Sequence, residues 1–162
     1  MKKLLLLTLS LVMILSLASC QAGFDPYDFT QQGLQITLDT SFVMTENSGY
    51  TACYRSSVAT VYVLREEFGD TLSKDLSLTE YTDQVLKANG MEREVTDSGD
   101  HLTFTYEYTI NDSVMVNETC LYKMSDAFWI VRFECRSDYY DSLNDSFTTW
   151  AASVQDVKIK AD

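Results

Sequence analysis

The sequence has little of what flexible, metal-binding or phosphate-binding proteins depend on. Its 162 residues include 6 glycines, 1 proline and 1 histidine. So little glycine and proline argues against a long disordered chain, and no glycine-rich phosphate loop is present. No Cys-x-x-Cys pair accompanies the lone histidine, which argues against a structural zinc site. We therefore expect no metal and no cofactor.

Basic residues are also scarce. The chain holds 12 Lys and Arg against 24 Asp and Glu, which gives a formal net charge of −12. A chain this acidic repels nucleic acid and anionic lipid headgroups, so neither is expected to bind it through charge. The acidity is explained well enough by the solubility of a secreted protein.

What the sequence does have is a membrane address at its start. Lys2 and Lys3 precede an apolar run over residues 4–17, which is the layout of a secretory signal and is short for a membrane span of about 20 residues. The run ends in Leu17-Ala18-Ser19-Cys20, which resembles the bacterial lipobox. We expect cleavage between Ser19 and Cys20 and lipid on the Cys20 thiol, with the mature protein on the extracytoplasmic face of a cell membrane.

Three segments are predicted from this pattern. Residues 1–19 form the signal peptide, residues 20–33 the lipidated Cys20 and a flexible polar spacer, and residues 34–162 a single globular domain. Gly23, Pro26 and Gly33 lie in the proposed spacer, where no apolar periodicity is visible. Fully extended, this spacer would reach about 40 Å from the membrane.

The pattern of the globular part changes period from element to element. Residues 102–110 alternate almost perfectly, with apolar or aromatic residues at the even positions. Short turns at 111–112 and 125–126 join this strand to the next two, so the strands should be antiparallel. The stretch 128–133 is apolar on both faces and should lie centrally. Strands are expected at 34–38, 42–44, 50–54, 58–68, 91–96, 102–110, 113–124, 127–136 and 156–160.

Two helices complete the order. Ser77 and Glu80 form a capping box at the start of the first helix, and Gly90 suits its C-terminal end. The second helix begins near Ser137, and five apolar residues recur along it at spacings of three and four: Tyr140, Leu143, Phe147, Trp150 and Val154. Helices that bury apolar stripes against an antiparallel sheet give an α+β fold.

Three cysteines remain after Cys20. With a two-residue turn at 125–126, opposed residues sum to 251, so Cys120 faces Val131 and Cys135 faces Val116. This pairing puts the two thiols about 13 Å apart along the sheet, beyond disulfide range. We expect free buried thiols, or at most one bridge, which would need Cys53.

The order and spacing of these elements resemble the PsbP-like superfamily, which includes small bacterial lipoproteins of the DcrB type. The matching motifs are Ser41-Phe42, the helix start Leu78-Thr79-Glu80-Tyr81 and the aromatic-rich strand 127–133, followed by the second helix and a last strand. The resemblance covers roughly residues 34–160. It implies an antiparallel sheet sandwiched by helices in α/β/α layers. It also implies a non-enzymatic accessory or binding role, with no family-wide catalytic residues.

Few residues carry chemistry on their own. His101 begins a strand on the polar side of its alternation and should be solvated, with no nucleophile motif beside it. Asp138, Asp141 and Asp145 share one helical face, but without the glycine and alternate ligands of a calcium loop. The candidate binding surface consists of tyrosines at strand ends and a helix start, because tyrosine suits half-exposed interfaces: Tyr50, Tyr54, Tyr139 and Tyr140.

The predicted function is that of a membrane-tethered, non-catalytic binding or accessory module of the cell envelope. Its partners would be the membrane, through lipid on Cys20, and an envelope protein or a small ligand. The alternatives are a small hydrolase of cell-wall or extracellular polymer, and a structural or stress-related protein without a discrete ligand. Close carboxylates in one pocket, or a cysteine beside His101, would favour the hydrolase. An exposed aromatic patch would favour the binding module.

Overall fold

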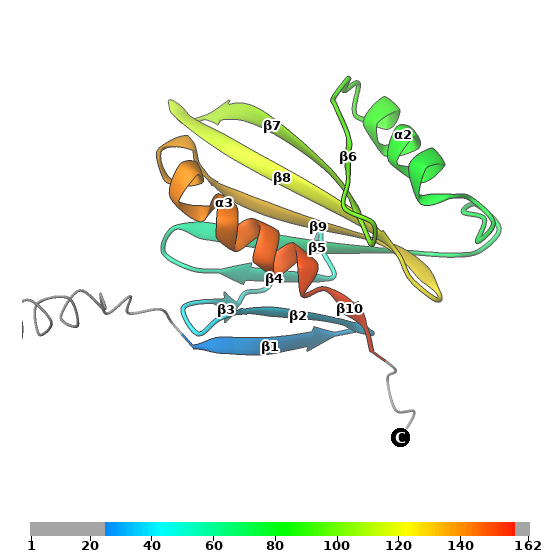
Figure 1. Ribbon diagram of the computed structural model, residues 1–162, viewed down its shortest axis with the longest axis horizontal. Helices are drawn as coiled ribbons and strands as arrows, with labels where there is room; N and C mark the ends of the chain where they lie inside the picture. Colours follow the sequence, from blue (N-terminus) through cyan, green and yellow to red (C-terminus); the bar gives the residue numbers. More distant parts are fainter. Residues whose placement is uncertain (1–24, 158–162) are drawn as a thin grey trace, which may run out of the picture.

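The computed structural model describes residues 25–157 (Figure 1). The proposed signal segment, Ser19, Cys20 and most of the expected strand at 156–160 lie outside the described residues. Within the described part, no helix is long and apolar enough to cross a membrane.

Seven antiparallel strands form the main sheet, in the order β3-β4-β5-β9-β8-β7-β6. The stretch 128–133, which is expected to lie centrally, belongs to β9, the fourth of the seven strands, between β5 and β8. The strands are β3 (Val43–Met44), β4 (Ala52–Arg55), β5 (Ala59–Glu67), β6 (Thr96–Asp97), β7 (Leu102–Ile110), β8 (Ser113–Lys123) and β9 (Ala127–Arg136). The segment expected as a strand at 91–96 is irregular over residues 91–95. Only Thr96 belongs to β6, where it pairs with Thr103 of β7.

A smaller sheet contains β1 (Pro26–Gln31), β2 (Leu34–Asp39) and β10 (Gln155–Asp156) in the order β1-β2-β10. The prediction that residues 20–33 are spacer is therefore wrong from Pro26 onward. β1 pairs along all of β2 through a tight turn at Gln32 and Gly33, whose φ angles of 48° and 99° are both positive. The globular domain begins at β1 rather than at residue 34.

The two helices pack on opposite faces of the main sheet, which gives the expected α+β architecture. α2 (Leu78–Ala88) has the predicted capping box: Ser77 accepts from the Glu80 amide, and Glu80 accepts from the Ser77 amide. α3 (Ser137–Ala152) lies on the other face together with the small sheet. Ser153, just after α3, links the two, because its Oγ accepts a hydrogen bond from the Thr37 amide of β2 at 2.9 Å.

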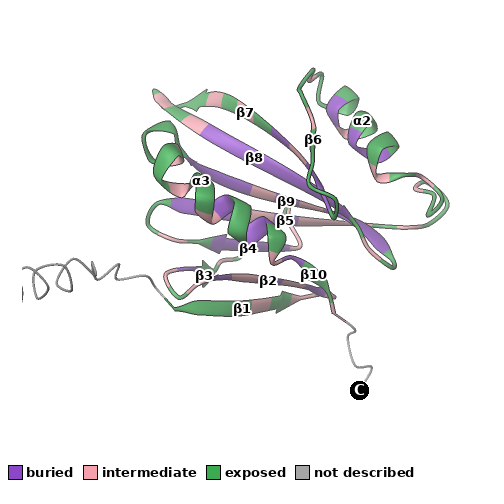
Figure 2. Cartoon of the chain, viewed as in Figure 1, coloured by how far each residue is buried: buried purple, intermediate pink, exposed green. Residues whose placement is uncertain are grey.

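Alternation along the strands divides the interior into two cores. Odd-numbered side chains of β9, such as Trp129 and Phe133, face α3 and the small sheet. Even-numbered ones, such as Phe128, face α2. Figure 2 shows the inner side of each helix buried and the outer side exposed. The α3 side is the larger core and contains Leu34, Ile36, Val61, Val131, Phe147 and Trp150, among others.

The register of the last hairpin agrees with the sequence prediction. Cys120 pairs with Val131 and Val116 pairs with Cys135. Cys53, Cys120 and Cys135 are buried and free. Burial raises the pKa of Cys120 to about 12 and that of Cys135 to about 11, so both are thiols rather than thiolates at neutral pH.

Candidate functional site

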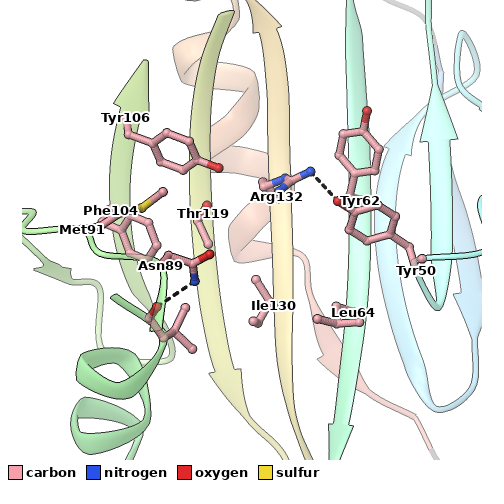
Figure 3. Close-up of a pocket in the computed structure, with 12 residues that line it drawn as sticks. Tyr50, Tyr62, Leu64, Asn89, Met91, Phe104, Tyr106, Thr119, Ile130 and Arg132 are labelled. Atoms are coloured by element: carbon pink, nitrogen blue, oxygen red, sulfur yellow. Dashed lines mark hydrogen bonds between the residues drawn. The ribbon is translucent and has the colours of Figure 1, made fainter. Parts of the chain in front are cut away.

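A cavity of about 330 Å³ lies on the α2 face of the main sheet (Figure 3). It opens where α2 stops covering the strands, and its lining comes from four strands, from the C-terminal part of α2 with the segment after it, and from the turn before β4. The lining residues are Gly49, Tyr50, Tyr62, Leu64, Val85, Asn89, Met91, Phe104, Tyr106, Thr119, Ile130 and Arg132.

The cavity exists because α2 covers only part of its face. Phe128 lies beneath the helix, stacked on Tyr81 with ring centres 4.0 Å apart. Ile130 and Arg132 are the next two side chains on that face of β9, and both line the cavity. The helix ends at Ala88 with Asn89 as its C-cap, followed by Gly90 with a φ of 64° that a glycine adopts without strain. The floor therefore changes from apolar to cationic just beyond the end of the helix.

Arg132 is the one charged residue of the lining. Its Nη2 donates to the Tyr50 hydroxyl at 2.6 Å, and its guanidinium carbon lies 4.7 Å from the Tyr62 ring centre and 5.3 Å from that of Tyr50. Its Nε is buried without an acceptor, and no ion pair of the described residues includes Arg132. Burial lowers the pKa of Arg132, but Tyr50, Tyr106 and Glu134 outweigh burial and raise it, so the guanidinium is charged.

Glu134, two residues along β9, has its negative charge held by donors. Its carboxylate accepts from the hydroxyls of Tyr62 and Tyr108 and, at 3.4 Å, from Asn117 Nδ2. The side chain is buried and does not line the cavity. Burial, followed by contact with Glu134, raises the pKa of both tyrosines, which keeps them protonated as donors.

Aromatic rings stand on two sides of the cavity. Phe104 and Tyr106 project from β7, and Tyr62 and Tyr50 stand across the floor from them (Figure 3). The Tyr106 hydroxyl is directed from β7 toward β8 and β9, and it makes no hydrogen bond to another described residue. No Asp, Glu, His or Cys is among the described residues of the lining. This arrangement suits the binding of a flat apolar group that carries a hydrogen-bond acceptor.

The four tyrosines expected to form one binding surface are not brought together. Tyr50 lines the cavity. Tyr54 is only 1% exposed and packs against Phe29 in the α3-side core, so its expected half-exposure is wrong: its position in β4 points it inward beneath β1. Tyr139 is 39% exposed on α3, and Tyr140 is partly buried with its hydroxyl donating to Glu118. These two lie on the face of the sheet opposite the cavity.

The expectation of a solvated His101 is also wrong. The ring is 6% exposed and stacks on Tyr122, with its Nδ1 at 2.6 Å from Asp100 Oδ1. Tyr122 belongs to the α3-side core, so the ring that stacks on it is turned inward. A second, polar pocket of about 660 Å³ includes Asp100, His101 and Glu118 in its lining. Each of these groups already contacts another protein group.

Metal-binding potential is low in the described part of the chain. Across residues 25–157, no group of three or more His, Cys, Asp and Glu side chains is arranged to hold a metal ion. Asp138, one of the three aspartates with shared helical spacing, accepts instead from Arg136 at 2.6 Å.

Sequence reasoning missed Arg132, Tyr62 and Tyr106. The alternation of 102–110 predicts one apolar face at the even positions, which includes Tyr106. Arg132 carries a readable signal as well, since it is the one charged residue in the otherwise apolar stretch 128–133. Nothing in the sequence says how far α2 extends over that face, so the hollow beside it could not be foreseen.

Comparison with known proteins identifies the fold. No family model matches the chain, and no curated protein matches its sequence. Solved structures do match: cyanobacterial PsbP (CyanoP) from Synechocystis sp. PCC 6803 at 18% identity and a TM-score of 0.54, over 88% of this chain and 99% of that one. A Bacteroides thetaiotaomicron protein matches at 8% identity and a TM-score of 0.61, over 86% of this chain and 50% of that one. The Saccharomyces cerevisiae Ran-binding protein Mog1p matches at 10% identity and a TM-score of 0.54, over 83% of this chain and 97% of that one.

Likenesses at these identities concern the fold alone. With the antiparallel sheets and two helices described above, they show that this chain has a PsbP-like α+β fold, as the sequence predicted. What the chain binds is a separate question, because a fold of this kind can carry unrelated sites.

Proposed function

We propose that this chain is a lipid-anchored, extracytoplasmic, non-catalytic binding module of the bacterial cell envelope, and that the Arg132 cavity is its ligand site. The observation that carries the proposal is the guanidinium of Arg132, which is set among aromatic rings in a cavity and forms no ion pair with a carboxylate of residues 25–157. A partly buried charge is costly unless something pairs with it, and a bound ligand would supply the partner.

The chemistry of the lining favours binding over hydrolysis. Acid–base or nucleophilic catalysis needs a titratable group beside the reacting atoms, and the described lining offers tyrosines, Thr119, Asn89 and an arginine. The second pocket, with Asp100, His101 and Glu118, is where the hydrolase alternative would have to act. There the His101 ring is paired with Asp100 and Glu118 with Tyr140, and burial raises the pKa of the neighbouring Cys120 away from a nucleophilic thiolate. These contacts support a structural role for that cluster.

Native mass spectrometry of the protein extracted from its own membrane tests both halves of the proposal. The mass of the chain reports cleavage before Cys20 and the lipid on it. A co-purified ligand mass reports an occupied cavity, and it should disappear in Gly49→Trp, which places an indole at the cavity wall. A Cβ at Gly49 meets only Asn47 Oδ1, at 3.7 Å, so the backbone tolerates the change.

Gly69→Trp is the matched control. A Cβ at Gly69 meets no atom within 4 Å, and this residue is not part of the cavity lining. It should retain the ligand mass. An unmodified Cys20 would contradict the anchoring, and a ligand mass retained equally in both variants would contradict the site.

A further inference from the structure

The proposed ligand site has a single cationic group, and its surroundings define the ligand's charge. The Nη2 of Arg132 donates a hydrogen bond to the Tyr50 hydroxyl, while its Nε has no acceptor among the described residues. A guanidinium has five N–H donors, so it retains donors for a ligand after the bond to Tyr50. Hydrogen bonds from a guanidinium to an anionic oxygen are stronger than those to a neutral one, so an anionic acceptor completes the group best.

Glu134, the neighbouring charged residue on this face of β9, raises the pKa of Arg132 but is in no ion pair with it among the described residues. Its carboxylate is buried and accepts from Tyr62, Tyr108 and Asn117, and of these three donors only Tyr62 lines the cavity. Arg132 is therefore one positive charge without an ion pair among the described residues, and it complements one negative charge on a ligand. A dianion would meet a repulsive field from the rest of the molecule without a second cation to offset it.

The rest of the lining defines the ligand's body. Phe104, Tyr106 and Tyr62 offer ring faces or edges, and Ile130, Leu64 and Val85 offer aliphatic surface. The volume of about 330 Å³ is at the lower end of the range of about 300–1,000 Å³ for small-molecule sites, which suits one or two fused rings. The free Tyr106 hydroxyl, directed toward the Arg132 side, is a second donor for the same anion (Figure 3).

We propose that the cavity binds a small planar monoanion, an aromatic carboxylate or sulfonate, with the anionic group on Arg132 and the rings against Phe104 and Tyr106. This inference rests on the proposed function, which requires only that the cavity take a ligand. It adds the charge and shape of that ligand.

A pair of fluorescent probes separates the two claims. 8-Anilinonaphthalene-1-sulfonate is an aromatic monoanion, a naphthalene that carries an anilino group, and N-phenyl-1-naphthylamine is the same skeleton without the sulfonate. Both should bind the folded protein, because the cavity accepts the two fused rings of the naphthalene that they share. Arg132→Met keeps side-chain length and removes the charge, so it should weaken the anionic probe at least about tenfold and the neutral probe by less than about twofold.

Arg136→Met is the matched control, since it removes an exposed arginine from the same strand outside the cavity lining. It should leave both probes unchanged. Equal loss of both probes in Arg132→Met, or equal loss of the anionic probe in the two variants, would overturn the inference. If neither probe binds the unaltered protein, the proposed function fails as well. If only the neutral one binds, the cavity stands as a ligand site and the anion does not.

Displacement keeps the test informative if Arg132→Met does not fold. On the unaltered protein, sodium 2-naphthoate should displace the anionic probe, and 2-naphthalenemethanol should need at least about tenfold higher concentration. Equal potency of the two competitors would overturn the inference. The same would follow if vesicles of phosphatidylglycerol displaced the probe while naphthoate did not, because the anion would then be a lipid headgroup.

Discussion

Along β9, side chains two residues apart have very different surroundings. On the α2 face, Phe128 lies beneath the helix and Ile130 lies at the helix end. Arg132 then lines the cavity, and the Glu134 carboxylate accepts hydrogen bonds from several donors. On the α3 face the same strand is apolar throughout. The site arises because one face of a central strand becomes polar where its helical cover ends.

Glu118 is a buried carboxylate on the α3 face of the main sheet, and its burial costs free energy. Burial raises its pKa, partly offset by the Tyr140 hydroxyl and by His101. The folded protein therefore binds the proton more tightly than the unfolded chain, and stability falls as pH rises from about 4.3 through the raised pKa. We expect Glu118→Gln, which still accepts from Tyr140, to raise the free energy of unfolding at pH 7 by on the order of 1 kcal/mol.

The gain should vanish at acid pH, where the natural carboxyl is already protonated. Urea denaturation of both proteins between pH 4 and pH 8 measures it. Glu107→Gln, on the exposed face of β7, is the control and should give little difference at any pH. A gain that does not change with pH would contradict the assignment to burial of the charge.

At the scale of elements, α2 depends on its N-terminal cap. The Ser77 Oγ accepts from the Glu80 amide at 3.2 Å, so Ser77→Ala leaves an unsatisfied donor in the first turn. We expect a loss of about 1 kcal/mol in the free energy of unfolding, measured by chemical denaturation. Gln84→Ala, exposed in the middle of the same helix, should stay within about 0.5 kcal/mol, and a similar loss in both would refute the capping role.

The status of β1 gives a second test at this scale. Phe29 packs on Tyr54 with ring centres 4.7 Å apart, as part of the sheet rather than of a spacer. Phe29→Ala should lower the free energy of unfolding by about 1–2 kcal/mol, less than the 3–5 kcal/mol of a fully buried phenylalanine. Thr30→Ala, on the exposed side of the same strand, is the control. Thermal unfolding that Phe29→Ala leaves unchanged would mean that β1 is dispensable.

The elements that sequence predicted well are those with two agreeing signals. α2 combined a capping box with a stripe, and the hairpins around β8 combined alternation with short turns, so even the pairing of Cys120 with Val131 followed. β1 was missed because its alternation is short, with Tyr27 and Phe29 as its only aromatic residues, and because Gln32 at a positive φ is not a familiar turn residue. The cavity depends on where elements from distant parts of the chain end, which local patterns do not encode.

For the whole molecule, the cysteines offer a combined test of folding and anchoring. Cys53, Cys120 and Cys135 are buried as free thiols. Ellman's reagent at pH 8 should find none of them in the folded, lipidated protein and all three after denaturation, because a thioether at Cys20 has no thiol to react. A fourth equivalent after denaturation would contradict lipidation, and rapid reaction before it would contradict their burial.

If Cys20 carries the proposed lipid, the position of β1 limits how the domain stands on the membrane. Pro26 is six positions after Cys20, so the proposed lipid lies at most about 20 Å of extended chain from the folded part. β1 belongs to the small sheet on the α3 side, whereas the Arg132 cavity lies on the other side of the main sheet. The domain would therefore stand with its cavity toward the aqueous compartment. Its occupancy would follow the concentration of solutes there, rather than the composition of the bilayer beneath it.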